Sequence, residues 1–126
     1  MQDKQRRVLY VEDNSANVKL MENIFQLMGD DVSLHIAMTA EEGISSAAEL
    51  KPDLILLDIQ LPGMDGYEAF EQLKMNKDLE QTPIFAITAN AMTEHQERIK
   101  QTGFNEYISK PLNVKDLIEL VKRYLD

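Results

Sequence analysis

The sequence predicts an α/β protein in which five strands and five helices alternate and the strands form one open parallel sheet. Short apolar segments alternate along the chain with longer segments whose apolar residues recur every three or four positions, the pattern of a strand followed by an amphipathic helix. Such alternation produces a doubly wound sheet with helices on both faces. Five units are too few to close an eight-stranded barrel. The length of 126 residues is typical of one domain, and we expect residues 1–126 to form it.

The first two units show both periodicities. Residues 8–11 are apolar and partly β-branched, as expected of a strand, and a helical stripe follows that ends near Gly29. This stripe consists of Val18, Met21, Phe25 and Met28. Residues 32–37 alternate apolar with polar side chains, which predicts a strand with one wetter face. Thr39 and Glu42 fit a capping box that begins the second helix.

The third unit contains the most apolar strand. Residues 54–57 are apolar without alternation, which suits a strand covered on both faces, and the strand ends at Asp58. A loop rich in proline and glycine follows. Asp65 and Glu68 then fit the cap of a third helix that extends to about Lys77.

The last two units differ in their apolar content. Residues 84–87 predict a fourth strand that ends at Thr88. The helix expected at about residues 92–102 has few apolar positions, so we expect it to pack loosely. Residues 107–109 predict a short fifth strand, and the last helix begins after Asn113 with a clear apolar stripe. That stripe consists of Val114, Leu117, Ile118, Val121 and Tyr124.

The composition argues against several classes of function. The chain has 13 Lys and Arg against 22 Asp and Glu, a net charge of −9, which argues against direct binding of nucleic acid or of anionic membranes. The chain has no cysteine, which excludes disulfides, thiolate zinc sites and a cysteine nucleophile. No apolar run approaches the roughly 20 residues of a membrane span, and no signal peptide precedes the first strand. We therefore expect a cytoplasmic protein.

Polar residues follow four of the predicted strands. The first strand ends in Glu12 and Asp13, the third in Asp58, the fourth in Thr88 and the fifth in Lys110. The carboxyl ends of parallel strands meet at one edge of the sheet, where such folds bind ligands. In the flavodoxin-like strand order 2-1-3-4-5 the first and third strands are neighbours, so Asp13 and Asp58 can share a ligand. In the order 3-2-1-4-5 they would lie roughly 10 Å apart. A shared site therefore favours the order 2-1-3-4-5.

Carboxylates gathered this closely need a cation. Two like charges about 5 Å apart repel by on the order of 3 kcal/mol at an effective dielectric constant near 20. Lys110 is one candidate cation, and a hard divalent ion such as Mg²⁺ with oxygen ligands is another. With its charge screened, a carboxylate can attack phosphorus and form an acyl phosphate. A metal, an ammonium and a hydroxyl group can each hold one oxygen of the transferred phosphoryl group.

Four motifs resemble those of response-regulator receiver domains, in an order and spacing that match this family over essentially the whole chain. These motifs are Val-Leu-Tyr-Val-Glu-Asp-Asn at residues 8–14, Leu-Leu-Asp-Ile-Gln-Leu-Pro-Gly-Met-Asp-Gly at 56–66, Ile-Thr-Ala at 87–89 and Tyr-Ile-Ser-Lys-Pro at 107–111. The resemblance implies a phosphoacceptor module of two-component or phosphorelay signalling, of the stand-alone or hybrid-kinase type. Its partner would be a histidine kinase or a histidine phosphotransfer protein. Such a module catalyses its own phosphorylation and slow autodephosphorylation and is not a turnover enzyme.

Position by position, the resemblance implies a complete site. Asp58 matches the phosphoacceptor of the family and also a metal ligand. Asp13 matches a direct ligand of Mg²⁺, with Mn²⁺ able to take its place, and Glu12 a second acid that often acts through water. The backbone carbonyl of Gln60 completes the metal shell, and Lys110 contacts the phosphoryl group and the acids.

The resemblance also implies a switch. The Thr88 hydroxyl moves to bond a phosphoryl oxygen, and the Tyr107 ring turns inward with it. Gln60 and Asn90 occupy positions that tune the attack of water on the phosphorylated state. The fourth helix, the fifth strand and the fifth helix form the surface that controls a downstream protein.

Simpler and competing interpretations stay open at this point. Glu12 and Asp13 suit the start of a helix, and Tyr107 suits a static, half-buried aromatic position. A Mg²⁺-dependent aspartyl-phosphate hydrolase needs a second aspartate two residues after the first, where this chain has Gln60. A flavin or nucleotide binder needs a loop rich in glycine or hydroxyl groups after the first strand, where this chain has acids.

Overall fold

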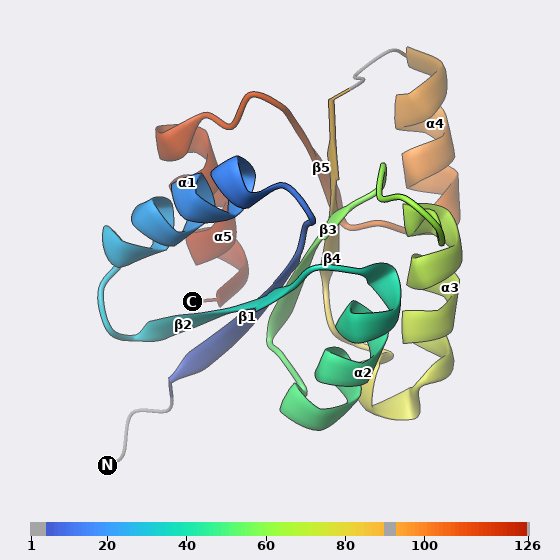
Figure 1. Ribbon diagram of the computed structural model, residues 1–126, viewed down its shortest axis with the longest axis horizontal. Coiled ribbons are helices and arrows are strands. Elements are labelled where there is room, and N and C mark those ends of the chain that lie inside the picture. The colour runs from blue at the N-terminus through green and yellow to red at the C-terminus, as the bar shows by residue number, and fades with distance from the viewer. Residues whose placement is uncertain (1–4, 90–92, 126) are drawn as a thin grey trace.

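The computed structural model describes residues 5–89 and 93–125, and their strands form a five-stranded parallel sheet in the order β2-β1-β3-β4-β5 (Figure 1). The strands are β1 (Arg6–Val11), β2 (Val32–Ala37), β3 (Leu54–Asp58), β4 (Ile84–Thr88) and β5 (Glu106–Ser109). The predicted fold class and strand order are confirmed, and the alternative order 3-2-1-4-5 is excluded.

Helices cover both faces of the sheet, so the described residues form three layers (Figure 1). The helices are α1 (Ser15–Gln26), α2 (Ala40–Leu50), α3 (Gly66–Met75), α4 (Thr93–Thr102) and α5 (Val114–Leu125). α1 and α5 bury one apolar cluster against the sheet, and α2, α3 and α4 bury a second cluster on the opposite face. Every residue of β3 and β4 is buried, as the unbroken apolar runs predict. Within residues 5–89 and 93–125, each helix is too short or too polar to cross a membrane.

Side-chain caps explain where four of the helices begin. Asn14, Thr39, Asp65 and Asn113 each accept a hydrogen bond from the backbone N–H three residues further along, which satisfies a donor that the helix cannot pair internally. The caps at Thr39 and Asp65 are as predicted. The N-cap of α1 is Asn14, so the interpretation of Glu12 and Asp13 as helix caps is wrong.

Two helices end earlier than the sequence predicts. α3 ends at Met75 rather than near Lys77, because Asn76 adopts an extended backbone and caps a separate 3₁₀ helix, η1 (Lys77–Leu79). α1 ends at Gln26, and Gly29 lies in the following turn with φ of +90°, a conformation that glycine adopts without a steric penalty.

The alternation of side chains along the strands determines on which face of the sheet each polar residue at a strand end lies. Tyr10 packs into the α1–α5 cluster, and Glu12 lies two residues further along the same face of β1. Leu56 and Asp58 have the same relation on β3, the paired neighbour of β1. Thr88 continues the opposite face of the sheet, which the α2–α4 helices cover. Glu12 and Asp58 therefore approach the carboxyl edge of the sheet from one face, and Thr88 approaches it from the other.

Gly66 allows α3 to start directly against the end of β3. A Cβ atom on Gly66 would lie 2.3 Å from the Cα atom of Ile59, a distance that no packed pair of carbons reaches. The Gly66 N–H instead donates to the Ile59 carbonyl at 3.3 Å. Glycine at this position thus keeps the loop after Asp58 short and close to the sheet.

Candidate functional site

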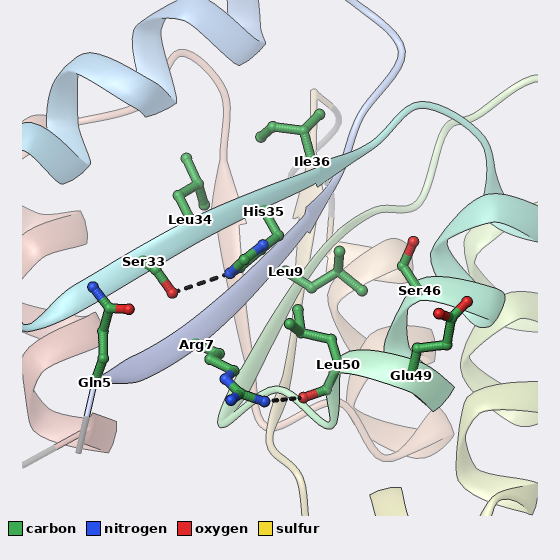
Figure 2. Close-up of a pocket in the computed structure, with 10 residues that line it drawn as sticks. All are labelled: Gln5, Arg7, Leu9, Ser33, Leu34, His35, Ile36, Ser46, Glu49 and Leu50. Carbon is green, nitrogen blue, oxygen red and sulfur yellow. Dashed lines mark hydrogen bonds between the residues drawn. The ribbon is translucent and has the colours of Figure 1, made fainter.

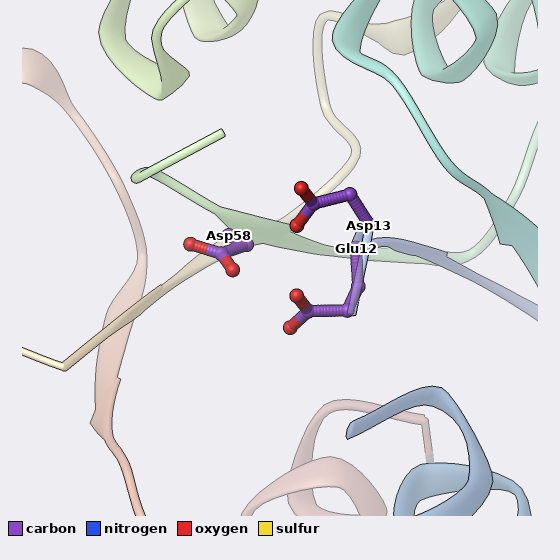
Figure 3. Close-up of side chains that lie close together, drawn as sticks. All are labelled: Glu12, Asp13 and Asp58. Carbon is purple, nitrogen blue, oxygen red and sulfur yellow. The ribbon is translucent and has the colours of Figure 1, made fainter. Parts of the chain in front are cut away.

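Three carboxylates converge at the carboxyl ends of β1 and β3 (Figure 3). Glu12, Asp13 and Asp58 each offer an oxygen atom, and these atoms lie within 4.8 Å of one another. Glu12 and Asp58 are only 1% and 3% exposed, whereas Asp13 is exposed to solvent. The pairing of β1 with β3 produces this cluster, so the predicted meeting of the acids is confirmed.

Lys110 reaches the acids from the loop after β5. Its Nζ atom lies 2.9 Å from Asp58 Oδ2 and 3.1 Å from Glu12 Oε1. Burial alone would lower the pKa of Lys110, but its hydrogen bonds and attraction to Asp58 and Glu12 outweigh burial and raise it. The lysine therefore stays charged and offsets part of the repulsion between the acids.

The two buried acids differ in how they are stabilised. Burial raises the pKa of Asp58, against the lowering effect of Lys110 and of the Gln60 N–H. Burial acts on Glu12 in the same direction, but hydrogen bonds from Tyr10, Lys110 and Asn14 outweigh it and lower the pKa of Glu12. Asp58 is thus the acid whose charge the protein satisfies less completely.

Gln60 connects the ends of β3 and β4 through both its backbone and its side chain. Its N–H donates to Asp58 Oδ1 at 2.8 Å, and its side-chain Oε1 accepts from the Ala89 N–H at 2.8 Å. Sequence reasoning missed the second bond, because the reach of an exposed side chain depends on the path of its loop. The assignment of the Gln60 carbonyl as a metal ligand stays a prediction.

The two predicted switch residues lie on the face covered by α2, α3 and α4. Thr88 ends β4 and is 1% exposed, and Tyr107 on β5 is half-buried against the apolar cluster of that face. Their roles stay predictions, and both a mobile and a static Tyr107 fit this position. Asn90, predicted to tune water attack, lies outside the described residues.

Tyr10 is a site residue that the sequence analysis missed. Its hydroxyl donates to Glu12 Oε1 at 2.7 Å, and its side chain is fully buried. Burial and the adjacent Glu12 carboxylate raise the pKa of Tyr10 far above its usual range. A usable signal was present, since a tyrosine two residues before an acid in a strand lies on the same face.

The donor set fits a hard divalent cation. The carboxylates follow two neighbouring strands, and that of Asp13 is open to solvent. This arrangement suits Mg²⁺, which prefers oxygen ligands and retains bound water.

A separate hollow of about 790 Å³ lies along β1 and β2 beside α2 (Figure 2). Arg7, His35 and Glu49 are among its lining residues, and none of the three clustered acids belongs to it.

Comparison with known proteins agrees with the geometry of the site. Residues 8–122 match the family described as the response regulator receiver domain. The chain is 41% identical over 120 residues to the polar-differentiation response regulator DivK of Brucella ovis, which covers 95% of this chain and 96% of DivK.

Solved structures of similar proteins share the fold. The receiver domain of the sensor histidine kinase PA1611 from Pseudomonas aeruginosa is 30% identical with a TM-score of 0.86, over 95% of this chain and 97% of that one. That structure holds a magnesium ion coordinated in its active site cleft. The chemotaxis response regulator CheY4 of Vibrio cholerae has a TM-score of 0.87 at 24% identity, over 96% of this chain and 99% of that one.

The family match extends from β1 into α5 and includes every residue of the acidic cluster. Together with the similarity to DivK along nearly all of both chains, it shows that this protein belongs to the response-regulator receiver domains, the family that operates in two-component signalling.

Proposed function

We propose that this receiver domain, residues 1–126, accepts a phosphoryl group on Asp58 from a phosphohistidine of a histidine kinase or a histidine phosphotransfer protein. One observation carries the proposal: the Asp58 carboxylate lies between the Lys110 ammonium and two further acids, and among residues 5–89 and 93–125 each of its oxygens has a single donor. A carboxylate oxygen has two lone pairs, so both oxygens keep one available for phosphorus or a metal.

The transfer step follows from the residues around Asp58. An Asp58 oxygen attacks the phosphorus, a P–O bond forms, and the P–N bond to the imidazole breaks with its electron pair staying on the ring, which takes up a proton. Lys110 offsets the added negative charge, and the Thr88 hydroxyl donates to a phosphoryl oxygen. When bound by Asp13, Asp58 and the Gln60 carbonyl, with Glu12 acting through water, Mg²⁺ or Mn²⁺ supplies further positive charge.

The proposed output follows from the position of the hydroxyl. Once Thr88 bonds the phosphoryl group, Tyr107 on the same face moves inward and the surface of α4, β5 and α5 changes for a downstream protein. Gln60 and Asn90 set the rate at which water removes the phosphoryl group. Gln60 has no titratable proton, so it does not provide the acid–base catalysis that a turnover hydrolase would need at this position.

Phosphorylation by a small donor tests the proposal. Incubation with acetyl phosphate and Mg²⁺ should add one phosphoryl group, detected by intact-protein mass spectrometry, and Asp58→Asn should abolish it. Asp78→Asn is the matched control, because Asp78 is an exposed aspartate that pairs only with Lys51 at the surface in the described part of the chain. Full phosphorylation of Asp58→Asn, or steady phosphoester turnover by the wild type, would overturn the proposal.

A further inference from the structure

We propose that Tyr10 is a positioning residue for the metal site: its buried hydroxyl holds the Glu12 carboxylate in place, so that Glu12 binds metal or metal-bound water while Lys110 turns to the phosphoryl group. This inference rests on the proposed function, because it assigns a role in the same site.

The contact between Tyr10 and Glu12 is fixed on both sides. The Tyr10 ring is fully buried in the cluster between the sheet, α1 and α5, where close packing restricts its movement. Its hydroxyl lies 2.7 Å from Glu12 Oε1. Because Glu12 directly follows β1 and continues the face on which Tyr10 lies, the ring and the carboxylate are held by the same strand.

The hydrogen bonds of Glu12 determine which of its oxygens is available. Oε1 accepts from the Tyr10 hydroxyl and from Lys110 Nζ, which is 3.1 Å away. Oε2 accepts from the Asn14 N–H at 3.2 Å. A carboxylate offers about four lone-pair positions, so the three donors from the described part of the chain leave one position, on Oε2, for a cation or a bound water.

The Tyr10 hydroxyl also allows Lys110 to be shared. Lys110 bonds both Asp58 and Glu12, and a phosphoryl group on Asp58 would draw the ammonium towards its own oxygens. Without Tyr10, that movement would leave Glu12 Oε1 buried and unpaired, a costly state for a carboxylate. With Tyr10, Oε1 keeps a donor throughout.

The test compares two tyrosines that make the same bond in different places. Tyr10→Phe removes the hydroxyl and keeps the ring. Tyr124→Phe is the control, because its hydroxyl also donates to a carboxylate at 2.7 Å, that of Glu106, away from the acidic cluster. By isothermal titration calorimetry, we expect Tyr10→Phe to weaken Mg²⁺ binding by about tenfold, as for other groups that orient metal ligands, and Tyr124→Phe to leave it unchanged.

A double-mutant cycle separates positioning from general loss of packing. In a Glu12→Gln background, adding Tyr10→Phe should weaken Mg²⁺ binding by less than twofold, because the carboxylate that Tyr10 positions is already gone. An equal loss in both backgrounds, or an affinity of Tyr10→Phe within twofold of wild type, would overturn the inference. The cycle measures Mg²⁺ binding alone, so it stands apart from a failure of Asp58 to accept a phosphoryl group.

A measurement on the wild type guards against poor folding of Tyr10→Phe. In protein labelled with ¹³C at tyrosine Cζ, titration with Mg²⁺ should shift the resonance of Tyr10 and leave that of Tyr124 in place. A Tyr10 resonance that stays unmoved at saturating Mg²⁺ would count against the inference.

Discussion

The acidic residues and the predicted switch residues reach the same edge of the sheet, but the protein holds the two groups very differently. Glu12 and Asp58 form ion pairs with Lys110 at 3.1 and 2.9 Å. The fully buried Tyr10 also donates a hydrogen bond to Glu12. The layer behind them includes α5, which buries Leu117, Val121 and Leu125.

The region beside Thr88 and Tyr107 is less firmly packed. Among the α4 side chains that the structure describes, residues 95–102, Ile99 alone is buried. α4 also contacts α3 through Arg98, which is exposed. The Arg98 guanidinium lies 3.7 Å from the centre of the Tyr67 ring. The acids and Lys110 are therefore held in place before any ligand binds, whereas α4, the helix proposed to respond, has little buried surface to lose.

Truncating one buried side chain on each helix should give the largest effects. Leu117 on α5 and Ile99 on α4 are each 2% exposed, and their replacement by alanine removes about 2–5 kcal/mol of packing. We expect Leu117→Ala to lower the free energy of global unfolding, measured by urea denaturation. Ile99→Ala should act at the low end of the range and speed amide exchange mainly within α4. Equal losses with uniform exchange would remove the distinction between the two regions.

Gly66→Ala tests how firmly the acidic end is fixed. Its Cβ would lie 2.3 Å from the Cα atom of Ile59, so we expect a loss of about 3 kcal/mol from overpacking. We also expect slower phosphorylation of Asp58, which directly precedes Ile59. Gly63→Ala in the same loop is the control. It has open space but φ of +84°, and its strain should cost only about 1 kcal/mol. Comparable losses for the two variants in chemical denaturation would contradict this reading of the loop.

Asp58→Asn should stabilise the metal-free protein at pH 7. Because burial raises the pKa of Asp58 above its unfolded value of 3.8, the folded state binds a proton more tightly, and stability falls as pH rises through the folded pKa. An asparagine does not ionise, so its advantage should be full above the folded pKa and vanish below pH 3.8. Thermal unfolding of both proteins at pH 7 and below pH 3.8 checks this prediction. A lower melting temperature of the variant than of the wild type at pH 7 would refute it.

Tyr124→Phe should change the free energy of unfolding least. It removes a hydrogen bond between α5 and β5. The Tyr124 hydroxyl donates to Glu106 at 2.7 Å, a contact worth about 1 kcal/mol. Burial and the Glu106 carboxylate raise the pKa of Tyr124 from 10.0 to about 12. The contribution of the hydroxyl is therefore complete below pH 10 and lost as pH rises towards 12. Denaturation of both proteins at pH 8 and 12 should show a stability difference that is clearly smaller at pH 12, and a constant difference would argue against it.

The sequence predicted what depends on periodicity and missed what depends on rotamers and loop paths. Strand ends carried Asp58 and Lys110 to one edge because parallel strands align their carboxyl ends. The Tyr10–Glu12 bond could have been predicted from the two-residue spacing in the first strand, but the rotamers that bring the hydroxyl to the carboxylate came only from the structure. The bond from Ala89 to Gln60 was not readable at all, since it joins two loops whose courses are set by the packed sheet.

The bond between the Ala89 N–H and Gln60 Oε1 affects what can bind at the carboxyl edge of the sheet. An oxygen atom that arrives beside Ala89 finds the N–H already engaged by Gln60 at 2.8 Å, and the amide side chain has to withdraw first. Exchange of one neutral hydrogen bond for another changes the free energy little. The Gln60 side chain therefore competes for the Ala89 N–H with any other acceptor at this edge of the sheet.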